Sequence, residues 1–207
     1  MSSRERWVIA SSNTGKVAEL QALLAREGFG TIELLTQTAL GIAPAPETAP
    51  TFVENALLKA RHASRISGLP ALADDSGLAV AALGGAPGVR SARYAGAAAT
   101  DAANVAKLLR ALEESQAADR SAAFHCVVVL IERPDDPAPL IATGRWDGEI
   151  AARPTGDGGF GYDPVFFDPT LGCTAAELPA EIKNTASHRG RALTSLLAAL
   201  RAARSTE

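Results

Sequence analysis

The sequence has few cysteines, few aromatic residues and no long hydrophobic run. Its two cysteines, Cys126 and Cys173, lack CxxC spacing and the clustering with histidine that a metal site requires, so we expect buried thiols in a reducing compartment. No apolar stretch approaches the roughly 20 residues of a membrane span, and the N-terminus has no secretory hydrophobic region. We therefore expect a soluble, cytoplasmic protein.

The sequence also lacks a strong excess of charge. Lysine and arginine number 20 and aspartate and glutamate 23, which gives a net charge of −3. This balance provides no basic surface for nucleic acid or for an anionic membrane, so an anionic ligand must be held by local cations. The hydrophobic content of 47% in 207 residues is sufficient for a large core.

Short apolar runs alternate with stretches of helical periodicity. The patterns predict an α/β or α+β fold on a mixed sheet, in which the segment LPALA is a strand that the sequence DDSG interrupts. An antiparallel pair is expected around the turn RPDDPA. The other expected elements are strands at residues 7–10 and 31–37, a helix after residue 13, and helices at 51–67, 100–114 and 179–204.

The segment SSNTGK, residues 11–16, lies where the first strand gives way to the first helix. Backbone N–H groups at a helix N-terminus attract anions, and Lys16 adds a positive charge that the helix dipole disfavours there. A bound phosphate would stabilise both. The alternative is an ordinary cap with a solvated lysine, and the segment does not match a P-loop.

Glu47 and Lys59 flank the start of the second predicted helix. A capping box, Thr51 with Glu54, opens this helix, and Lys59 lies two turns inside it. A glutamate near a helix start and a lysine on a helix surface are both common, so this segment alone indicates no function.

Two adjacent carboxylates, Asp74 and Asp75, stand between apolar runs. In a strand they would point to opposite faces, so at least one would be costly to bury unless a cation met it. Followed by Ser76 and a glycine, the pair is suited to bind a hard divalent cation or to activate water. An aspartate pair that begins a turn is the alternative.

Residues 154–166, PTGDGGFGYDPVF, contain the spacing GxGxxG. A dinucleotide-binding fingerprint must open a helix, which the following YDP disfavours, so we reject a Rossmann interpretation. The loop could instead offer Phe160 and Tyr162 to a base, with Asp163 as an acceptor. Alternatively, the aromatic rings fill the core.

A basic segment, residues 183–192, precedes the last apolar helix. It contains Lys183, His188 and Arg189, which supply donors for a carbonyl or phosphate oxygen. Positive charge at a helix start is unfavourable unless an anion meets it, as argued for Lys16.

Five segments, taken in order over almost the whole chain, resemble the inosine triphosphate pyrophosphatase family, and especially its bacterial members. They are SSNTGK, ETAPTFVENALLKARHA, ADDSGLAVAALGGAPGVRSARYAG, GGFGYDPVF and SHRGRAL. The resemblance implies one domain over residues 1–207, with an elongated central mixed sheet flanked by helices and two lobes around a cleft. It also implies a homodimer, dependence on Mg²⁺, and hydrolysis of ITP, dITP and XTP to the monophosphate and pyrophosphate, which cleanses the nucleotide pool.

The resemblance further implies roles for individual residues. Asp75 matches the proton acceptor, Glu47 and Asp75 match the metal-site carboxylates, and Asp74 would support them. Lys16 and Lys59 match cations that contact phosphate. The matched substrate-binding positions are Ser11, Ser12, Asn13, Thr14, Gly15, Lys16, Ser76, Phe160, Gly161, Tyr162, Asp163, Lys183, His188 and Arg189. Many relatives have glycine where this chain has Ser12, which affects the expected turn geometry.

On this hypothesis, Asp75 assists the attack of water on the α-phosphorus. Phe160 stacks on the base, while His188 and Arg189 contact its oxygen atoms, so that donors aimed at a 6-oxo group disfavour ATP. Three alternatives stay open: a related Maf-type enzyme that acts on pyrimidine nucleotides, a regulator that binds nucleotide without hydrolysis, and a redox enzyme that uses the glycine-rich motif.

Overall fold

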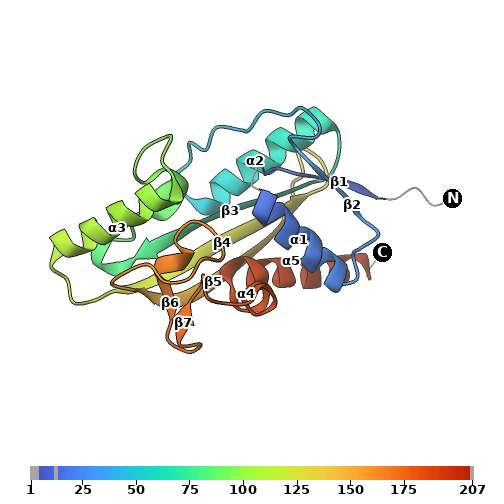
Figure 1. Cartoon of the computed structure of the whole chain (residues 1–207). Coiled ribbons are helices and arrows are strands. Elements are labelled where there is room, and N and C mark those ends of the chain that lie inside the picture. The colour runs from blue at the N-terminus through green and yellow to red at the C-terminus, as the bar shows by residue number, and fades with distance from the viewer. Residues whose placement is uncertain (1–4, 12–13, 206–207) are drawn as a thin grey trace. The chain divides into compact units, whose positions relative to one another are not determined.

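The computed structural model describes residues 5–11 and 14–205, and their side chains except those of residues 14–16 and 19. Helices and strands are mixed along the chain (Figure 1). The helices are α1 (Thr14–Arg26), α2 (Phe52–Ser67), α3 (Asp101–Ser115), α4 (Ala180–Ala186) and α5 (His188–Arg204). The strands are β1 (Arg6–Ile9), β2 (Glu33–Thr36), β3 (Ala71–Val80), β4 (Ser121–Ile131), β5 (Leu140–Ile150), β6 (Phe166–Asp168) and β7 (Cys173–Thr174).

The strands form one seven-stranded sheet in the order β2-β1-β3-β4-β5-β6-β7. Strand β1 pairs in parallel with both β2 and β3, whereas β6 pairs antiparallel with β5 and β7. Strands β4 and β5 are neighbours joined by residues 132–139, and so short a connection requires an antiparallel pair. The predicted α/β class, with a mixed sheet and a late hairpin, is confirmed.

The chain divides into two compact units. Unit 1 comprises Met1–Asp75, Cys126–Gly144 and Arg189–Glu207. Unit 2 comprises Ser76–His125 and Arg145–His188. Three of the four boundaries fall within β3, β4 and β5, so these strands contribute to both units, and the fourth falls after the first residue of α5.

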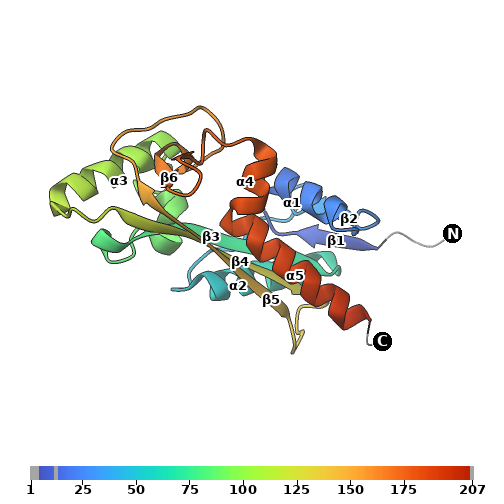
Figure 2. The same cartoon turned by 90° about the horizontal axis from the view of Figure 1, so that it is seen from below.

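In unit 1, helices cover both faces of the sheet (Figures 1 and 2). Leucines of α1 and α5 pack against Trp7 and Ile9 on one face. On the other face, the buried residues of α2 that pack on Val8 and Ala71 are alanines. Small side chains let this helix lie close to the strands, which brings the polar residues of the same helix near β3.

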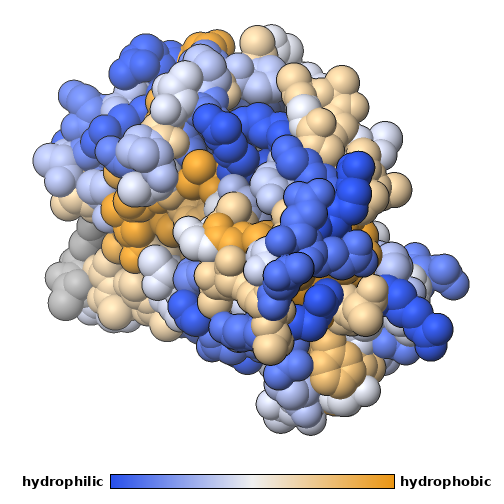
Figure 3. Space-filling model, turned by 90° about the vertical axis from the view of Figure 1, so that its left-hand side faces the viewer, coloured by the Kyte–Doolittle hydropathy of each residue, from blue (hydrophilic) through white to orange (hydrophobic). Residues whose placement is uncertain are grey.

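In unit 2, α3 packs on the far half of β3. Leu108 and Leu112 are fully buried with Leu78 and Val80. Aromatic side chains complete this core, and the Phe124 and Phe166 ring centroids lie 4.6 Å apart. The face of the molecule seen in Figure 3 has both hydrophilic areas and hydrophobic patches.

Three local predictions need correction. The strand LPALA does not stop at the aspartates, because β3 continues through Asp74 and Asp75 to Val80. The helix expected at residues 179–204 is broken at Ser187, which has an extended backbone between α4 and α5. Of the two cysteines, Cys126 is buried as expected, but Cys173 is only half-buried.

Other local predictions are confirmed. Helix α2 spans the expected residues: Thr51 accepts the Glu54 N–H at its N-terminus, and Gly68 ends it in the left-handed conformation. The glycine-rich loop leads to a short 3₁₀ turn, Asp163–Val165, and then to β6, so the rejection of a Rossmann interpretation is also confirmed. Among the residues that the structure describes, no helix is both long and apolar enough to cross a membrane.

Candidate active site

The order of the first three strands creates a switch point at the carboxyl end of β1. The chain passes from β1 to β2 through α1 on one face, and from β2 to β3 through α2 on the opposite face. In open α/β sheets, ligands bind at the carboxyl ends of strands where neighbouring connections diverge in this way. The register pairs Ile9 with Leu72, so Ser11, just after β1, and Asp74, within β3, each come two residues after this pair.

Both predicted carboxylates of β3 are buried at this position. Asp74 is 2% exposed and Asp75 6% exposed. Carboxylates at this depth are stable as charged groups only when cations and hydrogen-bond donors meet them. Their surroundings in unit 1 therefore decide whether the site is structural or functional.

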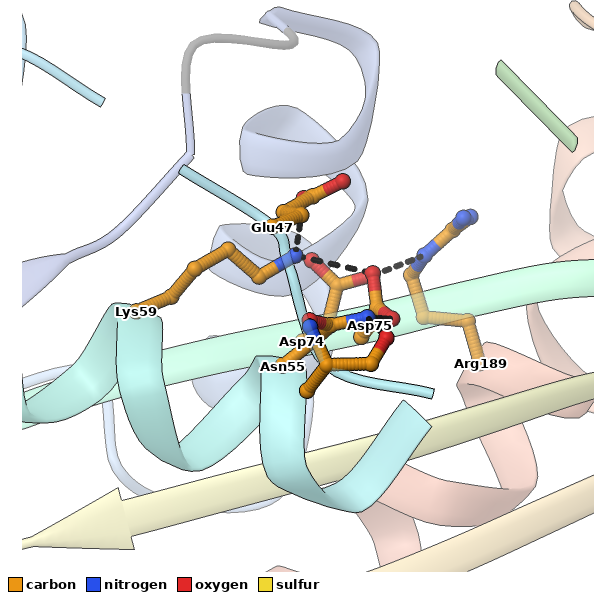
Figure 4. A network of polar contacts seen from close by, with 7 residues as sticks. Glu47, Asn55, Lys59, Asp74, Asp75 and Arg189 are labelled. Atoms are coloured by element: carbon orange, nitrogen blue, oxygen red, sulfur yellow. Dashed lines mark hydrogen bonds and ion pairs between the residues drawn. The ribbon is translucent and has the colours of Figure 1, made fainter. Parts of the chain in front are cut away.

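Lys59 joins the two predicted metal-site carboxylates (Figure 4). Its Nζ donates to Glu47 Oε1 at 2.8 Å and to Asp75 Oδ1 at 2.9 Å. Burial of Lys59 lowers its pKa, but the charges of Asp74, Asp75 and Glu47 outweigh burial and raise the pKa above its ordinary value. The resemblance assigns Lys59 to phosphate contact and Glu47 and Asp75 to a metal site, and the structure brings these three side chains together.

Asn55 is a member of this cluster that sequence reasoning missed. Its side chain is fully buried, and Nδ2 donates to Asp75 Oδ2 at 3.3 Å. The same amide bonds both backbone groups of Ala49, accepting from N and donating to O. Asn55 thus holds the loop that carries Glu47 against α2 and β3. The available signal was its position one helical turn before Lys59, on the same face of α2.

Arg189, the second residue of α5, lies beside Asp74. Its Nε is 3.8 Å from Asp74 Oδ2, and both side chains are almost fully buried. The resemblance places Arg189 among the substrate-binding residues, and the structure adds a role in supporting the carboxylates. The described side chains of the cluster comprise three carboxylates, of Glu47, Asp74 and Asp75, against the two cations of Lys59 and Arg189.

This donor set fits Mg²⁺. Mg²⁺ takes oxygen ligands and is usually held by one or two carboxylates together with substrate phosphates and water. Glu47 and Asp75 provide carboxylate oxygens that converge on one ammonium group. No cluster of three or more metal-type side chains occurs in the described part of the chain, so a metal here would depend on such shared coordination.

The first predicted motif is described only in part. Ser12 and Asn13 lie outside the described residues, and Thr14, Gly15 and Lys16 are seen as the first backbone turn of α1. Half-buried Ser11 lines a pocket of about 370 Å³ beside α1. The other residues of this pocket are Val17, Ala18, Gln21, Thr36, Thr38 and Ala39. The predicted helix start after a strand is confirmed, and it lies next to a hollow at the carboxyl end of β1.

In unit 2, the glycine-rich loop folds around the Asp163 carboxylate. Asp163 Oδ2 accepts the Phe160 N–H at 2.8 Å and the Lys183 ammonium at 2.6 Å. Lys183 Nζ also lies 4.9 Å from the centre of the half-buried Phe160 ring. A β-carbon at Gly159 would lie 2.1 Å from Asp163 Oδ2, so only glycine fits there. Three predicted residues, Phe160, Asp163 and Lys183, therefore form one group.

The remaining predicted residues of unit 2 differ in accessibility. Ser76 is half-buried on β3. Tyr162 is 4% exposed, and its hydroxyl donates to the Ser91 carbonyl at 2.8 Å, so its ring fills the core and is not placed to stack on a base. The His188 ring is 7% exposed and stacks on Phe124 with centroids 4.6 Å apart.

Fold and site together define an α/β protein with a buried carboxylate and lysine cluster where β3 continues beyond the carboxyl end of its parallel neighbour β1. This arrangement is suited to an anionic ligand that carries a metal ion. Residues 7–199 match the Ham1 family, and the chain belongs to this family. The resemblance drawn from the sequence is thereby confirmed.

Individual relatives are similar over nearly their full length. The chain is 55% identical over 197 residues to the dITP/XTP pyrophosphatase of Pectobacterium atrosepticum, covering 95% of this chain and 98% of that protein. It is 56% identical over 199 residues to the dITP/XTP pyrophosphatase of Methylococcus capsulatus, covering 96% and 98% respectively. These names agree with the enzyme class predicted from the sequence.

Solved structures show the same fold. A HAM1 protein from Coxiella burnetii superposes with a TM-score of 0.88 at 53% identity, covering 95% of this chain and 98% of that chain. A nucleoside-triphosphatase, also named dITP/XTP pyrophosphatase, from Mycobacterium abscessus has a TM-score of 0.73 at 44% identity, covering 94% and 99% respectively.

Proposed function

We propose that this protein hydrolyses the non-standard purine nucleoside triphosphates ITP, dITP and XTP to the monophosphate and pyrophosphate, and so removes them from the nucleotide pool before they enter DNA or RNA. The observation that carries the proposal is the bridge that Lys59 forms between Glu47 and Asp75. Relatives at 55% identity named dITP/XTP pyrophosphatase support the substrate class.

In the proposed reaction, Asp75 is the general base. Its carboxylate takes a proton from water as the water oxygen bonds to the α-phosphorus, and the bond from this phosphorus to the bridging oxygen breaks to release pyrophosphate. Asn55 and Lys59 fix the carboxylate through one bond to each oxygen. Lys59 and Lys16 stabilise negative charge on the phosphates.

Mg²⁺ is part of the proposal, with Glu47 and Asp75 as its protein ligands. When bound, it supplies neutralisation of the phosphate charge. The excess of carboxylates over cations among the described side chains of the cluster supports a further cation there.

Base selection is assigned to the group formed by Phe160, Asp163 and Lys183, with His188. Phe160 offers a half-buried ring for stacking, and Lys183 is a donor for a purine oxygen. The 6-amino group of ATP would leave a donor aimed at a 6-oxo group unpaired, which is costly in a desolvated site.

The test is release of pyrophosphate from ITP, dITP, XTP, ATP, UTP and dTTP, with Mg²⁺ and with EDTA. We expect fast turnover of the first three, poor turnover of ATP, and loss of activity in EDTA. Asp75→Asn should reduce kcat by about a hundredfold or more, the usual contribution of a general base. The exposed Asp135→Asn is the matched control.

Other outcomes would redirect the assignment. Preferential turnover of UTP or dTTP would indicate a Maf-type pyrimidine enzyme, and tight ITP binding without pyrophosphate release would indicate a regulator. Turnover of ATP equal to that of ITP would contradict the proposed base selection. A homodimer in the cytoplasm belongs to the same proposal, and light scattering of the purified protein measures the subunit number.

A further inference from the structure

Asp101, at the first position of α3, receives a hydrogen bond from the glycine-rich loop. Its Oδ2 accepts the Gly161 N–H at 2.7 Å, across 60 residues of sequence. The donor lies between Phe160 and Tyr162, and Gly161 has a left-handed backbone with φ of +65°.

The start of α3 is a fixed support for this bond. The Thr100 hydroxyl accepts the Ala103 N–H and caps the helix. One turn later, buried Asn104 donates to the Ala92 carbonyl and accepts the Ala95 N–H. The helix is therefore tied to the segment that precedes it, and its first carboxylate has a defined position.

A second bond holds the next residue of the loop to that same segment. The Tyr162 hydroxyl donates to the Ser91 carbonyl, and the Ser91 hydroxyl accepts the Leu78 N–H from β3. Gly161 and Tyr162 are thus held through α3 and its preceding segment. The backbone of Phe160 is then restrained on both sides, because its own N–H donates to Asp163.

We infer that Asp101 is a positioning residue for base recognition, acting through Gly161 to hold the Phe160 ring where it meets the purine. This role rests on the proposed function of the Phe160 group. Asp101 is exposed, and its hydrogen bond goes to the backbone of Gly161 in the proposed base-binding loop, so its effect falls on binding and base selection rather than on the chemical step.

The inference predicts a specific split in kinetics. Asp101→Ala should raise KM for ITP about three- to tenfold, the range for loss of one hydrogen bond, and leave kcat within about twofold. The ratio of kcat/KM for ITP over ATP should fall, because a loosely held ring discriminates less between bases. Hydrogen exchange at the Phe160 and Gly161 amides should become faster.

Two controls separate positioning from helix stability, since an acidic residue in the first turn also favours the helix dipole. Asp101→Asn loses the charge but keeps an acceptor oxygen, so it should resemble the wild type. Thr100→Ala removes the cap of the same helix and should lower stability, but it should raise KM for ITP less than Asp101→Ala does, because the bond from Gly161 to Asp101 is kept.

The outcomes are distinguishable. A rise in KM for ITP that is larger in Asp101→Ala than in both controls supports the inference. If Asp101→Ala, Asp101→Asn and Thr100→Ala raise KM for ITP equally, helix stability explains the change and the inference is overturned. An unchanged KM for ITP in Asp101→Ala would overturn it outright. A wild type that does not hydrolyse ITP contradicts the proposed function instead, and amide exchange in Asp101→Ala then decides alone whether Asp101 holds the loop.

Discussion

The Lys59 ammonium lies 2.9 Å from Asp75 Oδ1, with only 12% of the lysine side chain and 9% of the aspartate side chain exposed. The two residues come from α2 and β3, and Glu47 shares the same ammonium. One buried cation thus compensates two carboxylates, which makes Lys59 necessary for the stability of the site as well as for its proposed chemistry.

Lys59→Met is expected to lower the free energy of unfolding by about 2–4 kcal/mol, because it leaves buried carboxylates without their cation. Arg65→Met, at an exposed position of the same helix, should change stability by less than about 1 kcal/mol. Urea denaturation at neutral pH measures both. Equal stability of the two variants would contradict the compensating role.

The raised pKa of Lys59 also fixes the sign of its pH dependence. A group whose pKa is raised by folding stabilises the protein below its ordinary pKa, here 10.5, and the contribution is lost as the pH rises through the folded value. The difference in stability between wild type and Lys59→Met should therefore be constant near neutral pH and shrink only above about pH 10.5. A difference that shrinks between pH 6 and pH 8 would be inconsistent with this assignment.

Asn55→Leu preserves much of the side-chain volume but leaves the Ala49 backbone groups and Asp75 Oδ2 without this partner. We expect a loss of about 2–3 kcal/mol in stability and a higher Mg²⁺ concentration for half-maximal activity, because the Glu47 loop is no longer held.

Asn104→Leu is the matched control for Asn55→Leu. Asn104 follows its helix cap by the same four residues as Asn55, and it likewise bonds a backbone N–H and a backbone carbonyl of the preceding segment. Asn104→Leu should lower the free energy of unfolding by a similar amount, while the dependence of activity on Mg²⁺ stays as in the wild type. A shifted Mg²⁺ dependence in both variants would show that the effect is not local to the Glu47 loop.

Gly159→Ala should distort the loop of unit 2, since its β-carbon would overlap Asp163 and approach Lys183 Nζ to 3.0 Å. We expect stability to fall by more than about 2 kcal/mol and KM for ITP to rise. Gly172→Ala has a similar positive φ but open space around its β-carbon, so it should cost only about 1 kcal/mol. Calorimetry measures the stability of both variants, and ITP kinetics measure KM. The difference between them separates the effect of atomic overlap at Gly159 from that of backbone strain, which both positions share.

Asp136 provides a stability test away from the site. Its burial raises its pKa, but the N–H groups of Glu132 and Ala138 and the charges of Arg133 and Arg61 outweigh this and lower the pKa below its ordinary value. A carboxylate whose pKa is lowered by folding stabilises the protein at pH values above its ordinary pKa. This contribution is lost as the pH falls through the pKa of the folded protein.

Asp136→Asn should therefore be less stable than the wild type by about 1 kcal/mol at pH 7, with the difference shrinking below about pH 4. Urea denaturation between pH 7 and pH 3 measures the trend. A difference that widens as the pH falls would refute the sign.

Local signals predicted much of the fold. Helix α2 was predicted from its cap Thr51 to its stop Gly68, because capping and glycine geometry act over a few residues. The course of β3 was not, because a carboxylate pair within a strand is favourable only when distant residues compensate it. Arg189 lies more than a hundred residues from Asp74 in sequence, and no local pattern reveals their contact.

By itself, the sequence determined the family, the helices and strands with strong periodicity, and the segments that carry the charged and glycine-rich motifs, because these follow from short-range chemistry and from the order of long motifs. Only the tertiary structure decided that Asn55 joins Asp75, that the Tyr162 ring is buried, and that Asp101 holds Gly161. Each of these depends on long-range packing, which brings together residues from separate parts of the chain.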